Sequence, residues 1–263
     1  MLFGKKCSLI GVVHVHPLPG SSGYSGSMEQ VFSFALTDAI TYKDGGVDAI
    51  MVENMHDVPY LTGYVEPETT AAMTVIANAI KVQTKLPVGV QLLAGANLEA
   101  LGVAVACNLD FIRVEGFVFA HVGDEGIHDS CAAKLVRRRA HLKSGNIKIF
   151  ADIKKKHSAH AITSDVSLVE TAEAAAFFKA DGVIVSGAAT GKEPALQDVE
   201  SLRHGAGLPV LIGSGITPEN IPKYAPLVDG LIVGSSAKHD GHWENAVDAA
   251  RVKKLTQAIA KFK

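Results

Sequence analysis

The chain has 263 residues, of which 48% are hydrophobic and 20% are charged. This apolar content excludes a disordered or fibrous chain and is sufficient for a large buried core. The 25 Lys and Arg residues nearly balance the 27 Asp and Glu residues, so no basic field favours nucleic-acid binding. The apolar stretches have the length of strands and are interrupted by Gly, Asp or Lys, which predicts no membrane-spanning helix.

The three cysteines lack the spacing of a metal site, as expected for a protein of a reducing compartment. The N-terminal residues carry no small-residue cleavage pattern of a secretory signal. We therefore expect a protein of the cytoplasm or of an organellar matrix.

Strand-like and helix-like segments alternate from one end of the chain to the other. Short runs rich in Val and Ile are typical of parallel strands that are covered on both faces. These predicted strands are residues 8–13, 48–53, 87–93, 110–115, 147–153, 181–186, 209–212 and 229–234. Helical patterns are expected at residues 28–44, 68–84, 97–107, 130–144, 167–179, 195–204, 218–224 and 243–262.

A five-residue pattern that begins with aspartate recurs in every second predicted strand. It starts at Asp48, Asp110, Asp181 and Asp229. Eight right-handed strand–helix units in about 250 residues predict a closed (β/α)₈ TIM barrel. No linker or shift of composition divides the chain, so residues 1–263 are expected to form one barrel domain. The alternative is a doubly wound open sheet, whose phosphate-binding glycines usually lie in the first turn.

Glycine and serine follow the last two predicted strands, where phosphate-binding loops lie in many TIM barrels. Glycine lets backbone N–H groups approach an anion closely, and serine adds hydroxyl donors. We predict a phosphate site made by the loops after strands 7 and 8. Its candidate residues are Gly213, Ser214, Gly215, Gly234, Ser235 and Ser236. Tight turns without a ligand are the alternative interpretation.

Two histidines, His14 and His16, end the first predicted strand two positions apart and are expected to share one face. Such a pair can bind a divalent metal through neutral imidazoles. The pattern of a metal-dependent hydrolase is incomplete, because strand six ends in Ser186 and strand eight in Gly234. We therefore favour His16 as an acid or base and His14 as a substrate ligand, with no cofactor. A metal at this pair is the alternative.

Charged residues end two otherwise apolar strands, at Glu53 and at Arg113 and Glu115. Burying these groups against the helices would be costly, so we place them in the mouth of the barrel. There Arg113 is expected to bind an anionic group of the substrate while a carboxylate moves a proton. A structural ion pair between Arg113 and Glu115 is the alternative.

Polar residues also lie in the third and fifth predicted strands. Gln91 is expected to orient a substrate hydroxyl. Asp152 and Lys154 fall on the same side of the fifth strand by alternation. Asp152 is a candidate acid or base, and Lys154 is a candidate base, anion ligand or Schiff-base nucleophile. The neighbouring Lys155 and Lys156 are typical of a solvated charge run.

A polar loop follows the sixth strand, and Ser186, Thr190 and Gly191 in it are expected to contact the substrate. Its spacing is one residue short of a Walker A loop, so that motif is excluded. Residues 19–27 and 116–129 are two long loops that are expected to act as lids.

These motifs resemble the BtpA/SgcQ family along nearly the whole chain. The matching stretches are HVHPLPG at 14–20, GGVDAIMVEN at 45–54, GVQLL at 89–93, DFIRVEGF at 110–117, ADIKKKH at 151–157, DGVIVSG at 181–187, PVLIGSGIT at 209–217 and DGLIVGSSAKHDGHWENAVDAAR at 229–251. Lys155 and Ala246 depart from the forms typical of that family. The resemblance implies a (β/α)₈ barrel in which Lys238, Asp240 and Trp243 shape the site or close the barrel.

The resemblance also implies a phosphoribosyltransferase-like or nucleoside-phosphate enzyme, and it links photosynthetic members to photosystem I biogenesis. Our first hypothesis is an enzyme acting on a phosphorylated sugar or nucleoside phosphate by acid/base or glycosyl-bond chemistry. Its catalytic candidates are Glu53, Glu115, Asp152, Lys154 and His16. A non-catalytic assembly factor, a metal-dependent hydrolase and a Schiff-base aldolase are the alternatives. We expect a phosphorylated small-molecule substrate and a homo-oligomer.

Overall fold

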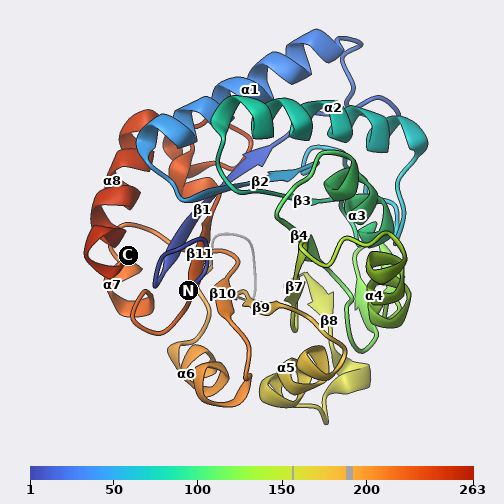
Figure 1. Ribbon diagram of the computed structural model, residues 1–263, viewed down its shortest axis with the longest axis vertical. Helices are drawn as coiled ribbons and strands as arrows, with labels where there is room; N and C mark the ends of the chain where they lie inside the picture. The colour runs from blue at the N-terminus through green and yellow to red at the C-terminus, as the bar shows by residue number, and fades with distance from the viewer. Residues whose placement is uncertain (156, 188–191) are drawn as a thin grey trace.

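A closed parallel barrel forms the centre of the molecule. The computed structural model describes residues 1–155, 157–187 and 192–263. Within these residues, eight parallel strands pair in the order β1-β11-β10-β9-β7-β4-β3-β2, which confirms the predicted barrel (Figure 1). Its strands are β1 (Ser8–His14), β2 (Ala49–Glu53), β3 (Val88–Gln91), β4 (Phe111–Val114), β7 (Lys148–Asp152), β9 (Gly182–Val185), β10 (Val210–Ile212) and β11 (Gly230–Val233).

Helices form a ring around the barrel (Figure 1). In the described ranges they are α1 (Met28–Gly45), α2 (Pro67–Thr84), α3 (Asn97–Ala106), α4 (Ala132–His141), α5 (Leu168–Phe177), α6 (Leu196–Gly205), α7 (Ile221–Tyr224) and α8 (Ala249–Ile259). Short 3₁₀ turns lie at η1 (Ala161–Thr163), η2 (Ser235–Ala237), η3 (His239–Gly241) and η4 (Ala260–Phe262). None of the helices in the described part of the chain is long and apolar enough to cross a bilayer.

Two predicted helix starts are wrong, and a side-chain hydrogen bond lies at each of the observed starts. The seventh helix begins at Ile221, because the side chain of Asn220 accepts the N–H of Thr217 at 2.8 Å and keeps the preceding residues in a turn. The eighth begins at Ala249, because the carboxylate of Asp248 accepts backbone N–H groups of the first helical turn.

The recurring aspartate ties neighbouring strands together where they begin. In each repeat, the carboxylate before one strand accepts a backbone N–H from the barrel strand that precedes it in the chain. These bonds are Leu9 to Asp48 at 2.8 Å, Val88 to Asp110 at 2.7 Å, Ile149 to Asp181 at 3.0 Å and Val210 to Asp229 at 3.0 Å. The repeat seen in the sequence is therefore a structural device of the barrel, remote from the ends of the strands where chemistry is expected.

The interior of the barrel changes from apolar to polar along the strands. The apolar part is made by Ile10, Val12, Ala49, Met51, Phe111, Phe150, Ile184, Leu211 and Ile232. Side chains alternate along a strand, so the next inward position toward the carboxyl end lies above this layer. Buried polar residues occupy it, namely His14, Glu53, Gln91, Arg113 and Asp152. This polar layer forms the floor of the barrel mouth.

A small antiparallel sheet adjoins the barrel. Residues 116–129, expected to be a loop, contain a hairpin in which β5 (His121–Gly123) pairs with β6 (Gly126–His128). A third strand, β8 (Ser158–Ala159), pairs with β5. Both segments follow the carboxyl ends of barrel strands, β4 and β7, so the sheet lies on that side of the mouth.

Candidate functional site

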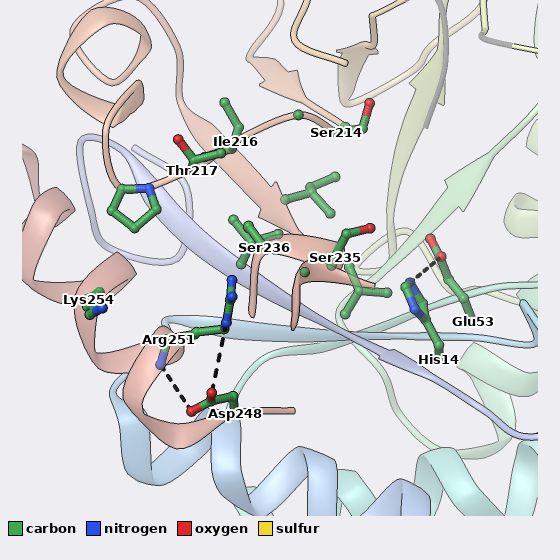
Figure 2. Close-up of a pocket in the computed structure, with 18 of the residues that line it drawn as sticks. His14, Glu53, Ser214, Ile216, Thr217, Ser235, Ser236, Asp248, Arg251 and Lys254 are labelled. Carbon is green, nitrogen blue, oxygen red and sulfur yellow. Dashed lines mark hydrogen bonds and ion pairs between the residues drawn. The ribbon is translucent and has the colours of Figure 1, made fainter. Parts of the chain in front are cut away.

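A cavity of about 580 Å³ opens at the carboxyl ends of the strands. Its walls come from the ends of β1, β2 and β4, from the loops after β10 and β11, and from the first turns of α8. Figure 2 shows His14 and Glu53 at one end and the α8 side chains Arg251 and Lys254 at the other. This is the position expected for the active site of a (β/α)₈ barrel.

All six predicted phosphate-loop residues line this cavity. Gly215 has φ +76°, and a side chain there would overlap the backbone of Lys192 and Glu193, so the turn requires glycine. Gly234 lets the imidazole of His14 pack close to the backbone, because a methyl group at this position would lie 3.1 Å from that ring. The hydroxyl oxygen of Ser236 is buried and has no partner among the described residues. The loops are thus closely packed, and the Ser236 hydroxyl in them is available to hydrogen-bond a ligand.

His14 and Glu53 face one another across neighbouring strands. Nδ1 of His14 lies 3.0 Å from the carbonyl oxygen of Trp243, which can only accept, so Nδ1 carries the proton. Nε2 is therefore the nitrogen that faces Glu53, 3.8 Å from Oε2 (Figure 2). Both side chains are almost fully buried and line the cavity. The pair can hold or exchange a proton next to a bound ligand.

Arg113 joins two carboxylates beneath the cavity. Its Nε and Nη2 donate to the two oxygens of Asp152 at 2.7 and 3.0 Å, and its Nη1 donates to Glu53 at 3.2 Å. Burial alone would lower the pKa of the guanidinium, but the charges of Asp152 and Glu53 raise it, so Arg113 stays charged. The alternative interpretation, an ion pair between Arg113 and Glu115, is wrong, because the guanidinium fork faces Asp152 across neighbouring strands instead.

Glu115 belongs to a second cluster under the small sheet. Lys155 lies 3.4 Å from Glu115 and 3.1 Å from Glu125, whose Oε1 is 2.6 Å from Nε2 of His128. Burial raises the pKa of Glu115 and the charge of Lys155 opposes that shift. The interpretation of Lys155 as part of a solvated run is wrong, since it is half-buried between two carboxylates.

Lys154 and Asp152 both line a small second cavity of about 20 Å³, and Lys154 does not line the large one. The strand ends at Asp152 and Lys154 adopts φ +47°, which turns the side chain away. Its ammonium group donates to the carbonyl of Thr163 at 2.7 Å. Among the described residues that line the large cavity, Lys254 is the one lysine. The Schiff-base hypothesis therefore has no support from the position of Lys154.

His16 also lies apart from His14, because β1 ends at His14. The ring of His16 stacks on Phe34 with centroids 4.7 Å apart and lies 5.1 Å from the ring of His56. Burial lowers the pKa of His16. In the described ranges no group of three or more His, Cys, Asp or Glu side chains is arranged to hold a metal ion. His14 thus lines the large cavity, whereas His16 does not and packs against Phe34 and His56.

The remaining predicted substrate ligands divide into two groups. Gln91 Oε1 and Ser186 Oγ are buried and have no partner among the described residues. Gln91 is paired in register with Glu53, which puts it in the polar layer. Thr190 and Gly191 lie outside the described residues, as does Lys156 of the predicted charge run. The sequence reasoning missed Arg251 and Lys254, which line the cavity although no spacing pattern connects them to the strands.

The sequence matches the BtpA family over residues 5–261. The chain belongs to the BtpA family. A mitochondrial protein of Caenorhabditis elegans is 43% identical and covers 100% of this chain and 96% of its own length. The photosystem I biogenesis protein BtpA of Synechocystis is 36% identical, over 96% of this chain and 88% of that protein. The structure of a thiamine phosphate pyrophosphorylase from Pyrococcus furiosus superposes with a TM-score of 0.61, at 14% identity over 98% of both chains, and shows the shared fold.

In this BtpA-family barrel, the residues after β11 are held by a buried ion pair. Lys238 is 1% exposed, and its ammonium group lies 2.6 Å from Asp38 on α1. The other oxygen of Asp38 accepts the N–H of Val247 at 2.8 Å. The same segment contains Trp243, whose carbonyl contacts His14, and Asp240 with φ +58°. The pair anchors to α1 the segment that leads from the loop after β11 to α8.

Proposed function

We propose that this protein is an enzyme that acts on a phosphorylated sugar or a nucleoside phosphate of the phosphoribosyl type. The observation that carries the proposal is one continuous cavity with glycine- and serine-rich loops on one side and His14, Glu53 and Arg113 on the other. Backbone N–H groups and serine hydroxyls are the donors that a phosphate requires. A phosphate held by the loops would bring the sugar carbons next to Glu53 and His14, which lowers the entropic cost of reaction.

Glu53 is the proposed acid or base, with His14 as its partner. Nε2 and Oε2 lie 3.8 Å apart, which is an ion-pair distance, so the charge on each group influences the protonation of the other. Glu53 can then deliver a proton to, or take one from, a sugar oxygen or carbon, as isomerisation or glycosyl-bond chemistry requires. Arg113 hydrogen-bonds to Glu53 and keeps its carboxylate in one orientation. Asp152 accepts the hydrogen bonds from Nε and Nη2 of the same guanidinium and is therefore a positioning residue.

The other proposed catalytic candidates have weaker support. Glu115 pairs with Lys155, and Lys154 with Thr163, on the side of the mouth that faces the small sheet. His16 packs among aromatic rings outside the end of β1. We therefore give them no direct part in the proposed chemistry.

The phosphate site is tested by titrating the protein with inorganic phosphate and ribose 5-phosphate, with ribose as the comparison. We expect both phosphates to bind and ribose to bind at least tenfold more weakly. Ser235→Asp adds a negative charge to the loop and should abolish phosphate binding. Ser201→Asp on the exposed surface of α6 adds the same charge elsewhere and should leave it unchanged. Equal affinity for ribose and ribose 5-phosphate would exclude the proposed site.

Catalysis is tested by incubating the protein with a panel of sugar phosphates and nucleoside phosphates and following conversion by ³¹P and ¹³C NMR. Glu53→Gln keeps an oxygen that accepts the hydrogen bond from Arg113, but the amide cannot give or take a proton as the carboxyl group does. We expect phosphate binding within about threefold of the wild type and a loss of turnover of at least 100-fold.

An assembly factor is the second candidate, because a relative that is 36% identical carries the name of a photosystem I biogenesis protein. In that case Glu53→Gln would retain full function in the cell, and no substrate of the panel would be converted. The location in the cytoplasm or in an organellar matrix belongs to the same proposal, and the mitochondrial name of another relative favours the matrix.

A further inference from the structure

The cavity continues beyond the phosphate loops to the first turns of α8. Arg251 and Lys254 line this outer end, on the far side of the Ser235–Ser236 segment from His14 and Glu53 (Figure 2). A ligand whose only anionic group is a terminal phosphate would end at the loops and leave this outer space unused. The cavity is therefore longer than such a ligand requires.

Both cations face the cavity because of their positions on the helix. Arg251 and Lys254 are three residues apart and share one face of α8, whereas Val252, Leu255 and Ile259 make the buried face. Lys253 is exposed and does not line the cavity. Lys254 is exposed as well, so what distinguishes Arg251 and Lys254 from Lys253 is that they line the cavity.

Two acids also line this end, and both are already engaged. Asp248 Oδ1 accepts the N–H of Ala250 at 2.8 Å, and Oδ2 lies 3.4 Å from Nδ1 of His239. The hydroxyl of Thr217 lowers the pKa of Glu219 and the charge of Lys254 lowers it further, so this carboxylate is hydrogen-bonded to Thr217 and also feels the charge of Lys254.

The N–H groups of the two cations, by contrast, remain available to a ligand. Nε of Arg251 forms an ion pair with Oδ2 of Asp248 at 3.9 Å, which is beyond hydrogen-bond distance (Figure 2). Within the described ranges, neither the guanidinium of Arg251 nor the ammonium of Lys254 donates a hydrogen bond to another residue. The buried hydroxyl of Ser236, which has no partner in that same part of the chain, lies on the wall between these cations and the polar layer. Unused donors therefore line the outer end as well as the loops.

We propose that Arg251 and Lys254 form a second anion subsite, so that the ligand of this cavity carries a diphosphate rather than a single phosphate. This inference rests on the proposed function and makes its substrate class narrower. The loops after β10 and β11 hold one phosphoryl group, and the guanidinium fork and the ammonium group bind the next. The sugar end still points toward Glu53 and His14.

The experiment compares inorganic pyrophosphate with inorganic phosphate by calorimetry, with a chelator present so that no divalent metal contributes. The wild type is expected to bind pyrophosphate at least tenfold more tightly than phosphate. Lys254→Gln should reduce this preference several-fold, and the Arg251→Gln/Lys254→Gln double variant should abolish it while phosphate affinity stays within about threefold. Lys253→Gln is the matched control, and it should retain the preference.

Three results would overturn the inference. Pyrophosphate binding no tighter than phosphate leaves the phosphate site of the proposed function intact but removes the second subsite. The double variant could weaken the binding of phosphate and pyrophosphate equally, or Lys253→Gln could lose as much of the preference for pyrophosphate as Lys254→Gln. Either result would mean that the net charge of the surface, and not a subsite, causes the preference. If neither anion binds to the wild type, the proposed function itself fails.

Discussion

Replacing Asp152 by asparagine tests the link between the polar layer and the stability of the barrel. The carboxylate accepts two hydrogen bonds from Arg113, at 2.7 and 3.0 Å, and its side chain is 2% exposed. In the Asp152→Asn variant, the amide that replaces the carboxylate would carry no charge and would turn one N–H donor toward the guanidinium. Arg113 would then keep one carboxylate, Glu53, at 3.2 Å.

Removing one partner of a buried ion pair costs about 3–5 kcal/mol, because the other charge is left uncompensated. The remaining bond to Glu53 puts the expected loss at the lower end, about 3 kcal/mol. For a chain of this size that corresponds to a fall in Tm of roughly 6–12 °C. Urea denaturation followed by circular dichroism measures it directly.

A double-mutant cycle with Arg113→Gln isolates the pair. We expect a coupling energy of at least about 2 kcal/mol, well above the roughly 0.5 kcal/mol of additive sites. Lys148→Gln is the control, because Lys148 is half-exposed and its bond to Asp181 at 3.3 Å should be worth less than about 0.5 kcal/mol. The reasoning would be refuted if Asp152→Asn lies within about 1 kcal/mol of the wild type, or if the two substitutions add.

Two further predictions concern the site and the small sheet. Gly234→Ala places a methyl group 3.1 Å from the imidazole of His14, so the ring must move, and we expect phosphate to bind at least tenfold more weakly. His121 has a pKa lowered to about 4 by burial and by the charges of His128, Lys155 and His160, although Glu125 opposes the shift. The unfolded chain takes up this proton first, so the stability from neutral His121 is complete above pH 6.5 and is lost as the pH falls toward 4, by at most about 3 kcal/mol.

The controls for these predictions come from the same chain. Gly102→Ala in α3 meets no atom within 4 Å, so it should leave phosphate binding unchanged and stabilise the helix by about 0.5–1 kcal/mol. His121→Phe removes the titrating group and should flatten the loss of stability between pH 6.5 and 4, whereas His204→Phe on exposed α6 should not. Unchanged phosphate affinity in Gly234→Ala, or an unchanged pH slope in His121→Phe, would contradict the respective argument.

Several features of this protein were predictable because their signals lie within a few residues. The spacing of apolar runs and the recurring aspartate indicate the barrel, and the aspartates form bonds between strands that are consecutive in the repeat. The glycine and serine residues after strands 7 and 8 are local turn chemistry, and they line the cavity as expected.

The partners of the charged residues were decided by the tertiary structure alone. Alternation placed Lys154 with Asp152 in the mouth, but β7 ends at Asp152, and the two residues meet at the small second cavity rather than at the large one. Arg113 pairs with Asp152 across the barrel sheet, and Arg251 reaches the cavity from the last helix. Such contacts depend on where a strand stops and how the closed sheet sets its register, which are properties of the whole barrel. Periodicity within the chain determines the elements, whereas closure of the barrel determines which side chains meet.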